Sequence, residues 1–528
     1  MKKAMAIFFC VFLAMAAFAQ APAAETRVLV DLSAGTAAVY GAQPVTIGSD
    51  TMLAEGISAR KTAYGFSLEA SGAAKVAWEL KGSLEGTLNI SSDSDTTIVL
   101  NGARIEAAEG PALNIKTKKR TTIELASESA NVFADTAKRI KELDEKAALS
   151  SKGTIEICGD GSLEIDAHYK NGIYTKEYIR IYSGTIRVSV TARDGIRADK
   201  GFILDGGDLS ILGTGAGIDE ESKGIKVDGV EGDPASGGIV INGGTLTIRT
   251  VGKGITAAWE AEEDAKTPDV ADDPDPDVTI RGGTIEVTTT GKPYERKDEK
   301  GNTVSCSPEG IEAKSDLVIT GGDLEIRTAD DCLNAGDSIR ISGGKILAVS
   351  SANDAIDSNG TLSISGGYIV AVGSGGPEGA FDCDANEFSV TGGTMLGFGG
   401  TTSGPTTSAS TQNILIAGGF PTGSEVSVRD PSGKTLIAFS SPVFLPTTIF
   451  STPGLTIGTE YTIWVDGVPS ATFTPTGTIT QIGGMIFGPG PGPGPGGFGG
   501  QPPEGAFPPP EGMGPPPEGW TPPTASKP

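Results

Sequence analysis

The chain has 528 residues, of which 76 are Gly and 33 are Pro, while only 6% are aromatic. This composition argues against one large globular core, and a hydrophobic content of 38% argues against a fully disordered chain. The formal net charge of −25 argues against nucleic acid as a partner, because phosphate binding requires a basic surface.

The first 19 residues have the three regions of a secretory signal peptide. Lys2 and Lys3 give a positive start, residues 4–16 form an apolar run, and Ala17–Ala19 form a small-x-small cleavage site. We therefore expect cleavage before Gln20 and a protein that is secreted or held at the cell surface. No later segment has the pattern of a transmembrane helix.

A repeat dominates the chain after an N-terminal β segment, residues 20–83, that we expect to act as a cap. A pair such as Gly206-Gly207 recurs, with steps of 22 or 23 residues where no loop is inserted. Apolar and polar residues alternate on both sides of this pair, which is the period of a β-strand. A third short apolar strand comes earlier in each unit, as at Gly195-Ile196.

Three short strands per unit without a helical period predict an all-β fold, a right-handed parallel β-helix over residues 84–411. About eleven coils are expected, each adding ~4.8 Å, with the Gly pairs at the corners. Residues 136–150 carry a helical pattern and predict a short helical excursion. Residues 412–484 predict a small C-terminal β domain. Residues 485–528, rich in Pro and Gly, predict a disordered tail that contacts the cell envelope.

Acidic and amide side chains recur at matching places in the last coils. Equivalent positions in adjacent coils lie ~4.8 Å apart, where two carboxylates repel by roughly 1–3 kcal/mol. Solvent screening or a ladder of Asn–Asp hydrogen bonds would offset this repulsion, and so would a hard cation such as Ca²⁺, which prefers oxygen ligands. The predicted calcium ligands are Asp331, Asn334, Asp354, Asp357, Asn359, Asp382 and Asp384.

Cysteine and histidine define no further site. His168 is the only His, which excludes a multi-His zinc site. The four cysteines after the leader are too widely spaced to indicate a disulfide framework, and free thiols are the equal alternative. They are Cys158, Cys306, Cys332 and Cys383.

The motifs "ADDCLNAGDSIRISGGKI", "ANDAIDSNGTLSISGGYI" and "GAFDCDANEFSVTGGTML" resemble the signature of a bacterial extracellular carbohydrate-binding family with a pectate-lyase-like parallel β-helix. "IFSTPGLTIGTEYTIW" is similar to the C-terminal β segment of that family. The resemblance implies binding of pectin, cellulose or similar polysaccharides, with calcium bound to the coils. The insertions at 260–277 and 293–309 differ from the family pattern.

The sequence leaves three functions open. The first is non-catalytic, calcium-dependent polysaccharide binding, with Tyr174, Tyr178, Tyr182 and Tyr368 as candidate sugar platforms. The second is an enzyme of the same fold, and the third is a structural or adhesive surface protein.

An enzyme would need catalytic side chains that the chain offers only in part. A polysaccharide lyase would need a cationic base beside carboxylates, and the candidates are Arg197 and Lys226 with Asp199 and Asp228. A hydrolase would need paired carboxylates with a nearby His, but the pair Asp330-Asp331 has none close in the sequence.

Overall fold

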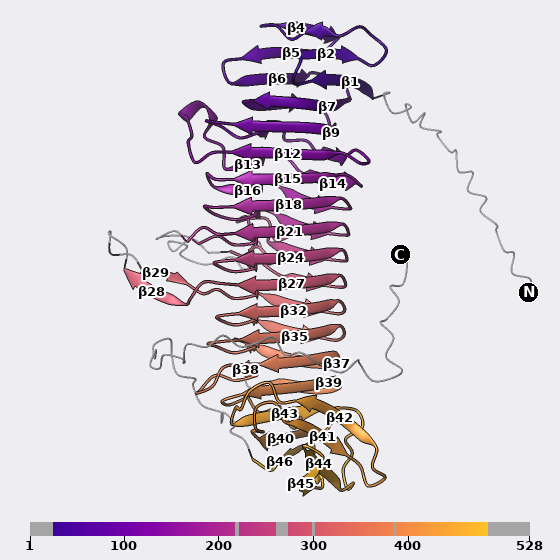
Figure 1. The fold of residues 1–528 in the computed structure, drawn as a ribbon, viewed down its shortest axis with the longest axis vertical. Coiled ribbons are helices and arrows are strands. Elements are labelled where there is room, and N and C mark those ends of the chain that lie inside the picture. Colours follow the sequence, from indigo (N-terminus) through magenta and orange to yellow (C-terminus); the bar gives the residue numbers. More distant parts are fainter. Residues whose placement is uncertain are drawn as a thin grey trace, which may run out of the picture.

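The computed structural model describes residues 25–216, 221–259, 273–297, 301, 303–384 and 387–483. In this part of the chain, strands stack coil upon coil into one elongated prism (Figure 1). The predicted signal peptide, the predicted tail and most of the acidic insertion at 260–277 lie outside the described residues. No helix in the described ranges is long and apolar enough to cross a membrane.

The first face of the prism is a parallel sheet of short strands. Its last eleven strands, β8 to β38, match the number of coils expected from the repeat. Its parallel strands are β6 (Gly65–Ala70), β8 (Thr87–Ser92), β10 (Leu113–Ile115), β13 (Ala147–Ser151), β16 (Asn171–Thr175), β19 (Ile196–Ala198), β22 (Ile225–Asp228), β25 (Ile255–Ala258), β30 (Ile311–Ala313), β33 (Leu333–Ala335), β36 (Ile356–Ser358) and β38 (Phe381–Cys383).

Two further parallel ladders close the prism, and four long strands bend round the corner between them. The second face holds β7 (Val76–Glu85), β9 (Thr96–Ala107), β11 (Thr121–Leu125), β14 (Ile155–Gly159), β17 (Tyr178–Ile181), β20 (Gly201–Leu204), β23 (Gly238–Ile241), β26 (Val278–Ile280), β31 (Asp316–Ile319), β34 (Ser338–Ile341), β37 (Thr361–Val372) and β39 (Phe388–Gly399). The third face holds β12 (Ala130–Asp135), β15 (Ser162–Ala167), β18 (Thr185–Val190), β21 (Asp208–Gly213), β24 (Thr245–Thr250), β27 (Thr284–Thr289), β32 (Asp323–Thr328) and β35 (Lys345–Ser350), together with the ends of β7, β9, β37 and β39. The predicted parallel β-helix is thereby confirmed.

The predicted glycine corners are also confirmed. Gly207 has φ +80°, in the left-handed region that other residues enter at a cost. A Cβ atom on Gly207 would lie 2.6 Å from the carbonyl oxygen of Gly184 in the preceding coil. The corner therefore requires glycine both for its backbone angle and for the close approach of the neighbouring coil.

The helical excursion predicted over residues 136–150 is wrong for most of its length. Only Lys141–Leu143 form a helical turn, the 3-10 helix η1, and Ala147–Ser151 form strand β13. Leu149 is fully buried between Leu113 and Ile173 of the adjacent coils. Burial of this apolar position in the core outweighs the local helical preference.

The two ends of the prism carry antiparallel strands. The N-terminal end consists of β1 (Thr26–Asp31), β2 (Thr36–Val39), β3 (Val45–Thr46), β4 (Thr51–Ala54) and β5 (Ile57–Thr62). At the other end, β40 (Ile414–Gly418), β43 (Thr447–Ser451) and β46 (Ile479–Gln481) extend the large sheet, while β41 (Glu425–Arg429), β42 (Thr435–Ser440), β44 (Tyr461–Val465) and β45 (Val468–Phe473) form a separate four-stranded sheet. A hairpin of β28 (Tyr294–Lys297) and β29 (Thr303–Cys306) projects from the side of the prism (Figure 1). The exact domain limits stay a prediction.

Candidate functional site

The middle residues of the first-face strands stack in one column from coil to coil. Their neighbours in each strand point into the core, so side-chain alternation turns this column away from the core. Tyr174, Thr256 and Glu312 in this column are nevertheless buried by other parts of the chain. The column changes from basic in the middle coils to acidic in the last ones. Its members are Tyr174, Arg197, Lys226, Thr256, Glu312, Asn334, Asp357 and Asp382.

A second acidic column lies just before these strands. The backbone N–H of Asp354 donates a hydrogen bond of 3.1 Å to Oδ1 of Asp331 in the preceding coil. The backbone N–H of Gly379 donates in the same way to Oδ1 of Asp354. One carboxylate oxygen of each Asp therefore ties two coils together, and both residues are buried.

The two columns meet at Asn334. Its Nδ2 donates to Oδ2 of Asp331 at 3.2 Å and to Oδ2 of Asp357 at 3.3 Å. Nδ2 of Asn359 donates to Oδ1 of Asn334 at 3.4 Å. The structure therefore brings these four predicted residues together and contains the hydrogen-bonded ladder that the sequence left as one alternative.

Asp382 and Asp384 stand at the end of the acidic column. Oδ1 of Asp382 accepts hydrogen bonds of 2.7 Å from the hydroxyl of Ser403 and from the backbone N–H of Cys383. Burial and the charge of Asp382 raise the pKa of Asp384. Asp382 is thus held by the last coil, beside the Asn334 network.

The carboxylates of this cluster resist ionisation. Burial, followed by the charges of Asp382 and Asp384, raises the pKa of Asp357 to about 7. Burial and the neighbouring carboxylates also raise the pKa values of Asp331 and Asp354 well above their ordinary value. Among the described residues, no Lys or Arg forms an ion pair with any of these three. The cluster therefore groups several carboxyl groups with no fixed cation beside these three to favour their ionised form.

The oxygen chemistry of this cluster fits a hard cation, since carboxylate and amide oxygens are the ligands Ca²⁺ prefers. The geometry does not form a ready-made cage: within the described ranges, no three His, Cys, Asp or Glu side chains are grouped so that they could hold a metal ion. The seven predicted ligands are thus partly assembled, and their role in metal binding stays a prediction.

In the middle coils the charges are neutralised within the protein. Nη2 of Arg197 lies 2.6 Å from Oδ2 of Asp228, and Nζ of Lys226 lies 3.0 Å from Oδ1 of the same residue. The hydroxyl of Tyr174 donates to Oδ2 of Asp199 at 2.8 Å, and burial is the first cause of its raised pKa. Both bases suggested for a lyase are therefore engaged in ion pairs.

A buried ion network separates the basic part of the column from the acidic part. Nζ of Lys253 lies 2.6 Å from Oε2 of Glu309 and 3.1 Å from Oε1 of Glu312, which also contacts Lys314 at 2.5 Å. Burial opposes ionisation of Glu312, but the two ammonium groups outweigh it and lower its pKa to about 2. Burial raises the pKa of Glu309 to about 7 despite its contact with Lys253.

The four tyrosines suggested as sugar platforms have different surroundings. Tyr174 is buried, and its ring packs beneath Lys146. The prediction that Tyr174 forms a sugar platform is therefore wrong. Tyr178 and Tyr368 are half-buried, and the hydroxyl of Tyr178 donates to the carbonyl of Ala235. Tyr182 is 40% exposed. Tyr182 therefore presents the most accessible ring of the four.

Other sequence candidates lie away from the acidic cluster or take structural roles. His168 lies 3.3 Å from Asp166 at the surface of the third face. Oδ1 of Asp330 accepts a hydrogen bond of 2.7 Å from Asn353. All four described cysteines are free thiols, so the alternative without disulfides is confirmed for them.

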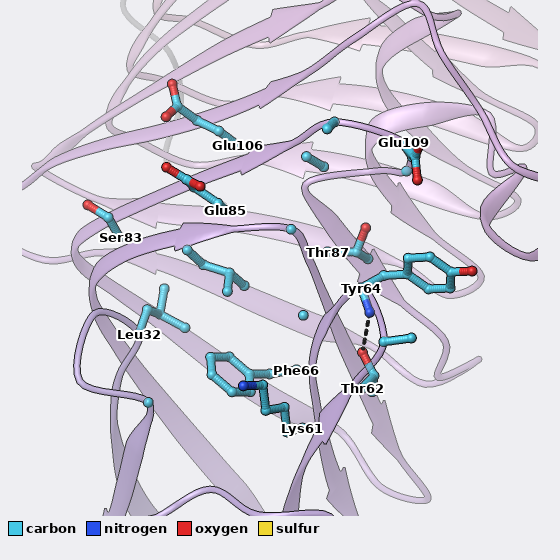
Figure 2. Close-up of a pocket in the computed structure, with 18 of the residues that line it drawn as sticks. Leu32, Lys61, Thr62, Tyr64, Phe66, Ser83, Glu85, Thr87, Glu106 and Glu109 are labelled. Atoms are coloured by element: carbon cyan, nitrogen blue, oxygen red, sulfur yellow. Dashed lines mark hydrogen bonds between the residues drawn. The ribbon is translucent and has the colours of Figure 1, made fainter.

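A cavity near the N-terminal end was not predicted from the sequence. Its volume of about 690 Å³ falls in the range of ligand cavities, roughly 300–1,000 Å³. Figure 2 shows Glu85 and Glu106 on one side of it and Tyr64 on the other. Five separate segments of the chain form its wall, so no local sequence motif marks it. The exposed side chain of Tyr64 is the one local feature that could have indicated it.

The fold and the polar columns define a parallel β-helix of the kind expected from the repeat. The sequence model of a family described as carbohydrate-binding domain-containing protein matches residues 68–354, more than half of the chain. The chain belongs to this family, which confirms the resemblance seen in its motifs.

Two known proteins are similar to parts of the chain. A carbohydrate-binding domain-containing protein of Acetivibrio thermocellus is 29% identical over 107 residues, which cover 19% of this chain and 37% of that relative. The chain thus spans little more than a third of that relative. The structure of a polysaccharide lyase-like protein from C. thermocellum, a gadolinium derivative, aligns with 50% of this chain and 94% of its own at 20% identity, with a TM-score of 0.33.

Proposed function

We propose that the protein binds extended polysaccharides of the pectin or cellulose type without cleaving them, and that Ca²⁺ at the acidic cluster supports this binding. The observation that carries the proposal is the set of three carboxylates, Asp331, Asp354 and Asp357, with raised pKa values and no cationic partner among the described residues. Membership in a carbohydrate-binding family supports the choice of ligand.

Calcium would relieve the repulsion within the acidic cluster. Asp357 and Asn334 are half-buried, so their oxygens reach both the buried carboxylates and the solvent. An ion held there by Asp331, Asn334 and Asp357 would retain coordination positions for ligand oxygens. On a protein with a net charge of −25, such an ion would bridge to the carboxylates of an acidic glycan.

The middle of the first face favours binding over cleavage. A lyase needs a base that is free to take a proton from the sugar ring. Arg197 and Lys226 are both ion-paired with Asp228, which supports a structural role for them. A polysaccharide lyase is the alternative function, because this arrangement places two cations and a carboxylate on adjacent coils.

The proposal also includes a location outside the cytoplasm. Residues 1–19 would direct it out of the cell, and residues 485–528 would contact the cell envelope. Polysaccharide outside the cell would then be its partner.

A pull-down of the full chain with polygalacturonate and with cellulose, in Ca²⁺ and in EDTA, tests this function. We expect Ca²⁺ to strengthen polygalacturonate binding and no absorbance of unsaturated products to develop. Asp357→Asn should reduce the increase in polygalacturonate binding that Ca²⁺ causes. Asp337→Asn is the control, because it changes an exposed carboxylate nearby in the chain, and it should leave that increase unchanged. Steady release of unsaturated ends that Lys226→Ala abolishes would establish the lyase instead, and absence of glycan binding would refute both.

A further inference from the structure

The outer surface of the third face carries a small basic hollow that the acidic columns do not touch. It lies over β18, β21 and β24 and has a volume of about 240 Å³. We call it the arginine patch. Its lining residues are Arg187, Val188, Ser189, Ser210, Ile211, Leu212, Thr247 and Arg249.

The strand register places an arginine at each edge of the patch. Arg187 stands in register with Ser210 and Thr247, whereas Arg249 stands in register with Leu212 and Ser189. The two arginines are thus two coils apart, roughly 9.5 Å along the prism. Leu212 is 43% exposed and lies between them, with three hydroxyl side chains around it.

Both arginines lack an internal partner. Within the described part of the chain, neither the Arg187 nor the Arg249 side chain forms an ion pair or hydrogen bond, and both side chains are exposed. Another arginine of the same face, Arg327, lies 2.9 Å from Glu325. Two unneutralised cations beside one hollow are unexpected on a protein with a net charge of −25.

The surrounding acidic residues do not neutralise the patch. Glu164 is in register with Arg187 on the preceding coil, and Glu286 with Thr247 on the following coil. Neither forms an ion pair with the two arginines in the described structure. Glu164 and Glu286 limit the basic area to three coils. The length of this area defines the length of ligand that the arginine patch can bind.

We propose that the arginine patch binds an acidic polysaccharide directly, through carboxylate groups on the sugar units and without a bridging metal. A guanidinium group presents a planar fork that matches a carboxylate with two parallel hydrogen bonds. Arg187 and Arg249 would each hold a carboxylate from a different sugar unit of one chain. Leu212 offers an apolar surface to the C–H face of a ring, and the hydroxyls of Ser189, Ser210 and Thr247 would hydrogen-bond sugar hydroxyls.

This site is separate from the proposed calcium cluster, because the two lie on different faces of the prism. The test is therefore the affinity for polygalacturonate in EDTA and at low ionic strength, measured by calorimetry on the full chain. The double variant Arg187→Gln/Arg249→Gln should bind at least about tenfold more weakly than the wild type. Arg327→Gln, which removes an ion-paired arginine from the same face, should stay within about twofold because its charge is already neutralised.

Five results decide the proposal. A tenfold loss of affinity in the double variant, without a similar loss in Arg327→Gln, supports the proposal, provided that circular dichroism shows an unchanged fold. Equal binding by the wild type and the double variant, or no binding in EDTA, overturns it. If dextran sulfate binds as tightly as polygalacturonate and competes with it fully, the proposal that the patch recognises carboxylate groups is overturned. Asp337→Asn, which removes an exposed carboxylate outside the patch, should leave the affinity in EDTA unchanged, and a matching loss in that variant also overturns the proposal. The calcium proposal is decided separately, by the response to added Ca²⁺.

Discussion

The side-chain amide of Asn334 donates a hydrogen bond of 3.3 Å to the carboxylate of Asp357 on the next coil. An amide placed between acidic residues of successive coils separates their charges and supplies a donor where another Asp would add repulsion. It does not neutralise them, since the pKa of Asp357 remains at about 7.

Asp357→Ala should weaken Ca²⁺ binding without unfolding the prism, whereas Ile356→Asp should unfold it. The Asp357 side chain belongs to the outward column, while Ile356 is fully buried in the core. A charge placed at Ile356 would have no partner, at a cost of several kcal/mol. Calorimetric Ca²⁺ titration and thermal melting measure the two effects. Equal losses of stability would show that the assignment of inward and outward positions is wrong.

Stability without calcium should fall as the pH rises from about 4 to about 7. Burial and like charges raise the folded-state pKa of Asp357 from 3.8 to about 7. The folded chain then holds a proton that the unfolded chain has already released, so its stabilising effect is present at low pH and is lost as the pH rises through 7. The Tm in EDTA should drop over this interval, and saturating Ca²⁺ should reduce the drop. A flat Tm profile in EDTA would contradict the raised pKa values.

The repeat allowed the fold to be predicted because its corners and core are local in sequence. Gly207 and Ile196 are examples of positions that recur from coil to coil. The spacing of the repeat is therefore enough to predict that the first lies at a corner and the second in the core. The same spacing aligned Asn334 with Asp357, as the strand register confirms. Strand β13 escaped prediction because the burial of Leu149 depends on coils on both sides of it.

The functional side chains were less predictable, because their partners depend on side-chain geometry. Spacing placed Arg197 and Lys226 on adjacent coils but could not show that both turn toward Asp228. The N-terminal cavity and the arginine patch each join residues from several coils that no motif links. Sequence periodicity thus predicts the position of a residue on its coil, whereas side-chain packing determines which groups that residue contacts.

Gly207→Ala should destabilise the prism by roughly 1–3 kcal/mol. The new Cβ would sit at φ +80° and 2.6 Å from a carbonyl oxygen of the preceding coil. Gly238→Ala is the matched control on the next coil, because no atom lies within 4 Å of its added Cβ and its φ is not positive. Denaturant unfolding compares the two. A similar effect of both substitutions would remove the corner as the cause.

Lys253→Met should be among the most damaging single changes on the first face. The ammonium group of Lys253 lies between two buried carboxylates, 2.6 Å from Glu309 and 3.1 Å from Glu312. Its removal leaves Glu309 without its ion-pair partner and Glu312 with Lys314 alone, and breaking such a buried network costs about 3–5 kcal/mol. Lys345→Met removes a lysine from an exposed pair with Asp323 and should cost less than about 1 kcal/mol.

The pH dependence of that loss separates charge from packing. In Lys253→Met, the lost ammonium group no longer favours ionised Glu309, so the pKa of Glu309 should rise above about 7. The folded variant should then keep its proton to a higher pH, and the destabilisation relative to the wild type should be smaller at pH 5 than at pH 8. Urea unfolding of both proteins at the two pH values measures the difference. A loss that is the same at both pH values would assign the effect to altered side-chain packing at position 253, with no contribution from the charge of Lys253.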